Sequence, residues 1–250
     1  MTPARWAVLA ACVYFAGVVD SLAGGGGLIT LPAYMAAGLP APLLLGTNKL
    51  GSALGTVGSC VNYQRRHKLD LRGLLPAFAL AMAGAVVGAR LGARLNAREL
   101  RLLLLVALPS LVLFLLARPR FGLEDVSHRH AGKTLAGRAA MIAAPVGAYD
   151  GFFGPPTGTF FALLLVRVCG YDIVGATARA KFLNLSTNVA ALVTFLWLGR
   201  VDYKVGLAMG AASLCGHWTG SHFGSTRGAR VIRPAMLLVC SALFLKLLLT

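Results

Sequence analysis

The stretch Gly17-Val-Val-Asp20, followed by the run Gly24-Gly-Gly-Gly27, returns in altered form in the second half of the chain as Gly147-Ala-Tyr-Asp150 and Gly154-Pro-Pro-Thr-Gly158. The first pairing has an offset of 130 residues. A row of glycines also recurs, at an offset of 132 residues: Gly84, Gly88 and Gly92 correspond to Gly216, Gly220 and Gly224. Duplicated apolar sequence that Gly and Pro break at matching positions is typical of secondary transporters, whose site lies between the repeats. We therefore predict a repeat at 5–117, a linker at 118–138 and a second repeat at 139–250.

The composition predicts a single all-α integral membrane domain over residues 1–250. Hydrophobic residues make up 57% of the chain, charged residues only 13%, and the mean hydropathy is +0.74, which leaves too little polar surface for a soluble protein of this size. The net charge of +16 could suggest a nucleic-acid partner, but no basic run is paired with stacking aromatics, and the charges fall between apolar stretches. We therefore expect the lipid bilayer, and no nucleic acid, as a partner.

Six apolar stretches come close to the roughly 20 residues that a helix needs to cross a bilayer: they are 44–64, 73–93, 100–117, 173–198, 204–225 and 231–249. Each half begins instead with two shorter segments around a Gly/Pro-rich break: Trp6–Val19 and Leu28–Ala37, then Ala139–Tyr149 and Thr159–Val168. Backbone without helical hydrogen bonds is tolerated at membrane depth only where protein or a wet cavity surrounds it. Each break is therefore predicted to lie against a site.

The loop charges predict how the broken units are placed. If both units cross the membrane, alternate loops carry net charges of +7 and +5; if both turn back as re-entrant hairpins, the two sides carry +9 and +3. The positive-inside rule favours the hairpins. Each repeat then adds three transmembrane helices, an odd number, so the two repeats must be inverted, with both termini outside the cytoplasm.

Lys49 and Lys181 occupy equivalent positions of the two repeats, at the same offset as the glycine rows, just after the breaks and in helices that are otherwise apolar. Buried charge in a membrane segment indicates function by default. We predict that the ammonium groups, neighbouring amides and hydroxyls, and helix N-termini at the breaks bind an anion; the alternative is that these groups only cap the helix start. The predicted substrate-binding residues are Gly25, Gly26, Gly27, Thr47, Asn48, Lys49, Thr157, Gly158, Lys181, Asn184 and Asn188.

Asp20 and Asp150 are also paired by the repeat. They are predicted to accept from these donors, to counter the lysines or to carry a coupled proton. The two glycine rows predict flat helix faces that pack closely in equivalent surroundings. His217 and His222 lie in the second of these helices, where burial with a backbone partner is a better interpretation than a proton relay.

Four ordered motifs carry a family resemblance: 16–32, Gly46-Thr-Asn-Lys-Leu50, 147–160 and 180–188. Together they resemble the TauE/SafE sulfite-exporter family of bacterial membrane permeases, over nearly the whole chain. The resemblance implies a multi-pass protein of the bacterial inner membrane that moves small sulfur-containing anions, such as sulfite or organosulfonates. The chain departs from the family pattern at the second break, where similar sequences have Gly-Pro-Gly and Pro156 here follows Pro155. The second proline removes a backbone donor from the predicted anion loop.

The sequence thus predicts a permease and not an enzyme: a secondary transporter for a small anion that works by alternating access, coupled to the proton gradient. It contains no ATPase motif, no Ser/His/Asp set, no H-E-x-x-H and no paired carboxylates near a nucleophile. The five cysteines lack C-x-x-C or histidine spacing, so we expect no metal and no cofactor. The main alternative function is an anion channel, and an intramembrane enzyme is a weaker alternative. The sequence is also compatible with a homo-oligomer.

Overall fold

The computed structural model describes residues 2–92, 122–152, 154 and 156–249. Over these residues the regular structure is entirely helical, in agreement with the predicted all-α class. The elements are α1 (Pro3–Ala23), α2 (Gly27–Ala36), α3 (Ala41–His67), η1 (Arg72–Leu74), α4 (Leu75–Gly92), η2 (Ser127–Arg129), α6 (Gly132–Phe152), α7 (Thr157–Leu164), the π-helical turn η3 (Leu165–Cys169), α8 (Ile173–Trp197), α9 (Tyr203–Arg227) and α10 (Ala229–Leu249).

Five of the six predicted spans coincide with the long helices α3, α4, α8, α9 and α10, and the sixth, 100–117, lies outside the described residues. Side-chain caps fix two of the helix starts. The carboxylate of Asp172 accepts from the amides of Val174 and Gly175 at the start of α8, and that of Asp202 accepts from the amide of Val205 at the start of α9. An aspartate at this position satisfies amides that have no partner within the helix.

The first helix is longer than predicted. The predicted segment ended at Val19 and was too short to cross a membrane, whereas α1 continues through Asp20 and spans 21 residues. Among the described helices, two stretches are long and apolar enough to cross a membrane: Pro3–Ala23 and Arg72–Leu91. The prediction that neither segment around the first break reaches spanning length is therefore wrong for α1.

α6 also exceeds its predicted bounds. It begins at Gly132, inside the predicted linker, and continues past Asp150 to Phe152. Asp150 and Asp20 were expected to open the breaks, but each is paired with a lysine and remains inside its helix. The interruptions are thus shorter than predicted: α2 begins four residues after α1 ends, and α7 begins five residues after α6 ends.

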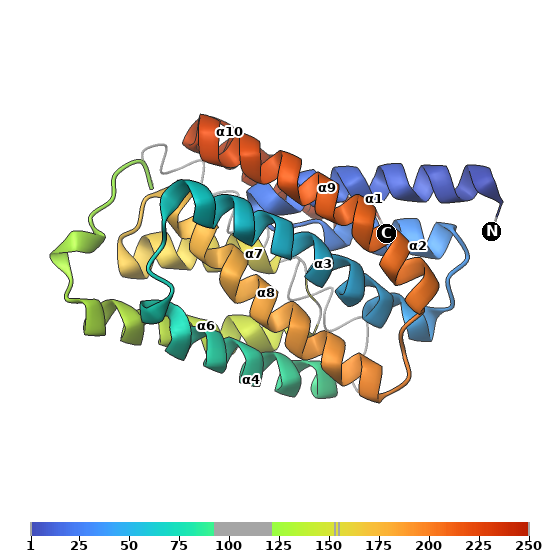
Figure 1. The fold of residues 1–250 in the computed structure, drawn as a ribbon, viewed down its shortest axis with the longest axis horizontal. Helices are drawn as coiled ribbons and strands as arrows, with labels where there is room; N and C mark the ends of the chain where they lie inside the picture. Colours follow the sequence, from blue (N-terminus) through green and yellow to red (C-terminus); the bar gives the residue numbers. More distant parts are fainter. Residues whose placement is uncertain (1, 93–121, 153, 155, 250) are drawn as a thin grey trace.

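α1 and α2 form one helical hairpin, and α6 and α7 form another (Figure 1). Arg5 and Leu9 of α1 share a crevice with Ala36 of α2, at the open end of the first hairpin. At the open end of the second, the guanidinium of Arg138 in α6 donates to the main-chain oxygen of Val168, 2.9 Å away. The hairpins open toward opposite ends of the molecule, and their tips meet in its middle (Figure 1).

The two tips touch at glycines. Gly24 ends α1 in the left-handed conformation with φ of 74°, and a Cβ placed there would lie 2.2 Å from the Cα of Gly158 in the first turn of α7. No side chain fits so close an approach. Both halves are thus interrupted near the predicted breaks, and this contact brings the two interruptions together.

The two glycine rows pack as predicted. A Cβ at Gly84 or Gly88 of α4 would run into the main chain of α6, and a Cβ at Gly216 or Gly220 of α9 would run into the main chain of α1. The small residues therefore bring the backbones together. Each row packs against the first helix of a hairpin, so the surroundings of the two rows correspond.

Four of the charged loops lie at one end of the molecule. Asp70, Ser127 and Tyr171, from three separate loops, line one depression, and Gly228 after α9 lies against Val174 near the start of α8. These are the four loops whose charges sum to +9 in the hairpin arrangement. The α8–α9 connection lies elsewhere, beside the start of α3.

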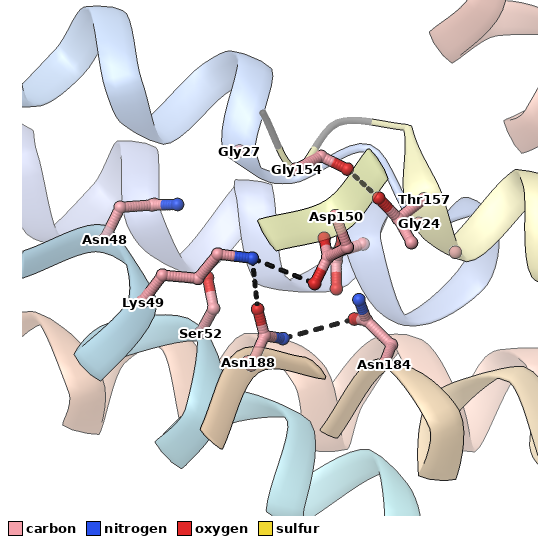
Figure 2. Close-up of a pocket in the computed structure, with 12 residues that line it drawn as sticks. Gly24, Gly27, Asn48, Lys49, Ser52, Asp150, Gly154, Thr157, Asn184 and Asn188 are labelled. Atoms are coloured by element: carbon pink, nitrogen blue, oxygen red, sulfur yellow. Dashed lines mark hydrogen bonds and ion pairs between the residues drawn. The ribbon is translucent and has the colours of Figure 1, made fainter. Parts of the chain in front are cut away.

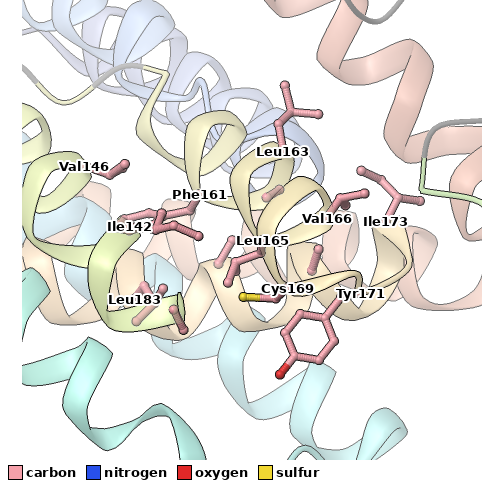
Figure 3. Packing of buried hydrophobic residues seen from close by; sticks show 14 of the residues in the cluster. Ile142, Val146, Phe161, Leu163, Leu165, Val166, Cys169, Tyr171, Ile173 and Leu183 are labelled. Atoms are coloured by element: carbon pink, nitrogen blue, oxygen red, sulfur yellow. The ribbon is translucent and has the colours of Figure 1, made fainter. Parts of the chain in front are cut away.

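The largest hydrophobic cluster joins α6, α7, η3 and α8 (Figure 3). Phe161, Leu165 and Leu183 are fully buried in it and pack with Ile142 of α6. In a bilayer such packing stabilises through van der Waals contact rather than through water exclusion. The cluster holds the second hairpin against α8 and so fixes the position of Asp150 relative to α8.

Candidate functional site

A small cavity lies where the two hairpin tips meet α3 and α8 (Figure 2). Its volume is about 30 Å³, which is room for one or two water molecules. Its walls consist of glycine backbone and polar side chains. The lining residues are Asp20, Gly24, Gly27, Asn48, Lys49, Ser52, Asp150, Gly154, Thr157, Gly158, Asn184 and Asn188.

Lys49 of α3 points from the cavity wall toward α6 and α8 (Figure 2). Its ammonium Nζ lies 2.9 Å from Oδ2 of Asp150 and 2.9 Å from Oδ1 of Asn188, and its side chain is only 5% exposed. The amide of Asn188 in turn donates to Oδ1 of Asn184 over 3.3 Å. The asparagines on α8 therefore orient the ammonium toward the cavity.

Lys181 of α8 is buried behind the opposite wall. Its ammonium donates to the main-chain oxygen of Asp20 and lies 3.2 Å from that residue's Oδ2. The Asp20 carboxylate has two further partners, the amide of Gly26 at 3.0 Å and Nε2 of His217 at 3.0 Å. This network ties the tip of the first hairpin to α8 and α9.

The lysines and aspartates exchange partners between the two halves of the chain. Lys49 from the first half pairs with Asp150 from the second, and Lys181 from the second pairs with Asp20 from the first. Pairing offsets the large cost of removing each charge from water. The two aspartates therefore counter the lysines, which is one of the three roles that the sequence predicted for them.

Two helices begin at the cavity. α2 starts at Gly27 and α7 at Thr157, and both residues line the wall. A helix N-terminus carries partial positive charge, which favours an anion. The amides of Leu28 and Thr157 already donate to main-chain oxygens of the tips, so the contribution of these helix starts is electrostatic. The positive ends of two helices thus add to the ammonium of Lys49.

The structure brings most of the predicted site residues together. Of the substrate-binding set, Gly27, Asn48, Lys49, Thr157, Gly158, Asn184 and Asn188 line the cavity, as do Asp20 and Asp150. Four predicted residues do not line it: Gly25, Gly26, Thr47 and Lys181.

Three of the four have other contacts: Lys181 pairs with Asp20, as described above, and Thr47 and Gly26 each take part in a hydrogen bond. The hydroxyl of Thr47 accepts from the amide of Asp202 over 2.9 Å, which pins the α8–α9 connection to α3. The amide of Gly26 donates to Asp20 and so closes the first hairpin tip. Thr47 therefore fits the alternative that polar groups at the start of this helix stabilise structure.

Sequence reasoning missed Ser52 and His217. Ser52 lies three residues after Lys49 in α3 and lines the same wall, so helical spacing alone could have indicated it. His217 was expected to have a backbone partner, and its Nδ1 does lie 2.9 Å from the main-chain oxygen of Ser213. Its second partner, the Asp20 carboxylate, was not foreseen.

Comparison with known proteins fits this geometry. The profile of the family described as sulfite exporter TauE/SafE matches residues 9–247. The chain belongs to this family. A probable membrane transporter protein, ORF9, of Sinorhizobium sp is 38% identical over 97% of the chain and 92% of its own length, and the probable membrane transporter protein YfcA of Escherichia coli K12 is 36% identical over 99% and 91%.

A probable membrane transporter protein of Haemophilus influenzae is 32% identical over 91% of the chain and 89% of its own length. No solved structure matches the chain significantly. Membership of the sulfite-exporter family makes the chain a membrane transporter rather than an enzyme, and it confirms the resemblance that the four motifs carry.

Proposed function

We propose that the chain carries a small anion across the bacterial inner membrane by alternating access, and that the central cavity is the binding site. The observation that carries this proposal is the meeting of two hairpin tips at a cavity whose wall holds an ammonium group and two helix N-termini. The family's description favours sulfite, an organosulfonate or a related sulfur anion as the substrate.

Lys49 is the cation that meets the substrate. Its ammonium faces the cavity between Asp150 and Asn188, whereas Lys181 lies behind the wall. An entering anion competes with Asp150 for the ammonium, and the carboxylate takes it back when the anion leaves. Such an exchange keeps the lysine neutralised in both states and prevents the anion from binding too tightly to be released.

We further propose that the two hairpins are re-entrant and that repeats 5–117 and 139–250 are inverted. Three observations support this arrangement: the hairpins open at opposite ends, the glycine rows have corresponding surroundings, and the loops with the larger positive charge share one end. With that end in the cytoplasm, both termini are periplasmic. Because both tips border one cavity, moving either tip opens it toward one side only.

Transport assays on purified protein in proteoliposomes test the site. We expect saturable uptake of sulfite that is accelerated by sulfite on the opposite side. Lys49→Met should weaken sulfite binding about 100-fold, because the variant keeps the length of the side chain and loses its charge. Lys204→Met, at an exposed position near the start of α9, is the matched control and should bind sulfite as the wild type does.

Unchanged affinity in a well-folded Lys49→Met protein would refute the site and leave the asparagine amides as the alternative. Ohmic conductance without saturation or counterflow would identify a channel instead of a carrier. The topology is tested separately, with reporters fused after Thr250. A reporter that is active only in the cytoplasm would contradict the re-entrant hairpins.

A further inference from the structure

His217 lies between two hydrogen-bond acceptors. Its ring is 2% exposed in α9, with Nδ1 2.9 Å from the main-chain oxygen of Ser213 and Nε2 3.0 Å from Oδ2 of Asp20. A neutral imidazole carries one N–H, so it can donate to only one of these oxygens. Both contacts are hydrogen bonds only if one more proton is present, either on the ring or on the Asp20 carboxyl.

The other tautomer does not remove this requirement. The hydroxyl of Ser213 lies 3.3 Å from Nδ1 and could donate to it, which would leave Nε2–H for Asp20. That arrangement would set the Nδ1 lone pair against the Ser213 carbonyl oxygen at 2.9 Å. The carbonyl is the closer partner, which favours a hydrogen on Nδ1 and an extra proton between Nε2 and Oδ2.

The groups around this proton determine its effect on the site. Lys181 of α8 holds the same carboxylate, and the titratable side chains on the facing part of α3 are the buried Cys60 and Tyr63, both neutral. Lys181 neutralises Asp20, and Lys49 neutralises Asp150. The cavity region is therefore neutral without the extra proton and carries one net positive charge with it.

We propose that His217 and Asp20 form a proton-binding dyad, and that the anion binds together with this proton. This inference rests on the proposed function and gives it a coupling ion. Asp20 lines the cavity, so the charge gained there attracts the anion directly. Without the proton, the ring nitrogen and the carboxylate face each other with lone pairs, and the contact that holds the first hairpin tip on α9 weakens. Protonation thus favours both anion binding and a docked tip.

The test measures proton uptake when an anion binds. Methanesulfonate carries a single charge at every pH used and takes up no proton itself; sulfite is the second probe. We expect wild-type protein in weak buffer to take up about one proton per methanesulfonate bound. Affinity should fall about tenfold per pH unit once the dyad loses its proton, because linkage makes the coupling reciprocal.

His217→Gln keeps an N–H for Asp20 but cannot take up the proton, so we expect weaker anion binding with neither proton uptake nor pH dependence. His222→Gln is the control on the same helix: His222 is exposed, contacts Arg66, and its loss should leave proton uptake intact. Spectra of 15N-histidine in the wild-type protein give a second readout, which does not depend on whether the variant folds. They should show both nitrogens of His217 protonated, or Nδ1 protonated with Nε2 sharing the proton of Asp20.

The outcomes separate the two proposals. If neither probe binds to the folded wild type, the proposed function fails and the coupling fails with it. If a probe binds without proton uptake, if His217→Gln retains the uptake, or if the Nδ1 of His217 has no proton, the dyad is refuted and the anion site stands.

Discussion

The two hairpin tips hold their aspartates in different ways. Asp20, at the first tip, has three partners: the ammonium of Lys181, the ring of His217 and the amide of Gly26. Asp150, at the second tip, meets the ammonium of Lys49, which lines the cavity. Positions that correspond in the sequence therefore differ in their partners: both aspartates line the cavity, but Lys49 lines it as well, whereas Lys181 does not.

The sequence shows where this difference arises. The offset that relates Gly216 to Gly84 pairs His217 with Ala85, which is fully buried where α4 crosses α6 close to Gly151. Only one of the two corresponding helices thus places a titratable ring beside an aspartate. This difference gives Asp20 a ring partner that an alanine at position 85 cannot give to Asp150.

The largest effect is expected at the contact of the two tips. Gly24→Ala would place a Cβ 2.2 Å from the Cα of Gly158, and backbone must move to accept it. We expect the free energy of unfolding to fall by about 4 kcal/mol, of which about 1 kcal/mol is the cost of positive φ. Thermal unfolding in detergent measures this loss.

Gly38→Ala is the matched control for this prediction. Gly38 also has positive φ, of 87°, but a Cβ there has no neighbour within 4 Å. Its loss should stay near 1 kcal/mol. Equal losses in the two variants would mean that the tips do not need to touch.

Asp20→Asn should have the next largest effect and act on stability. The substitution leaves the ammonium of Lys181 buried without its carboxylate, and breaking a buried pair in this way costs about 3 kcal/mol. The same measurement on Asp150→Asn should show a smaller loss, because Lys49 faces the cavity and keeps Asn188 as a partner. A larger loss in Asp150→Asn would reverse the assignment of the two tips.

The smallest effect is expected on affinity. Asp150→Asn removes the competitor for the ammonium of Lys49, so the variant should bind sulfite about tenfold more tightly, while counterflow slows because release becomes harder. Asp70→Asn, at an exposed loop position, is the control and should change neither quantity. Weaker binding in Asp150→Asn would show that the carboxylate helps to hold the substrate.

Much of this arrangement could be predicted from the sequence because the duplication marks it. The breaks, the glycine rows and the paired lysines and aspartates recur at fixed offsets, and a recurring polar group in an apolar helix needs a partner. The partner itself could not be predicted. Whether Lys49 meets Asp20 or Asp150 depends on the direction from which each hairpin enters, which spacing along the chain does not determine.

Because spacing along the chain does not show which helices meet, three details of the site were predicted wrongly or missed. α1 was predicted to end before Asp20 because its apolar stretch was bounded at that charge; Lys181 pairs the charge, and the helix continues. Thr47 was assigned to the cavity since it lies two residues before Lys49, but residues two apart on a helix do not share a face. The contact of His217 with Asp20 was missed because the helix that packs against α9 was unknown. That helix is α1, which approaches closely because Gly216 has no side chain.

The exchange of partners also constrains how the protein is made. Lys49 lies 101 residues before Asp150, and Asp20 lies 161 residues before Lys181, so neither charge can be paired while its own helix is leaving the ribosome. Inserting an unpaired charge at the centre of a helix costs about 3 kcal/mol. α1 and α3 therefore either enter the bilayer with an unpaired charge or wait at its surface or in the translocon until α6 and α8 arrive.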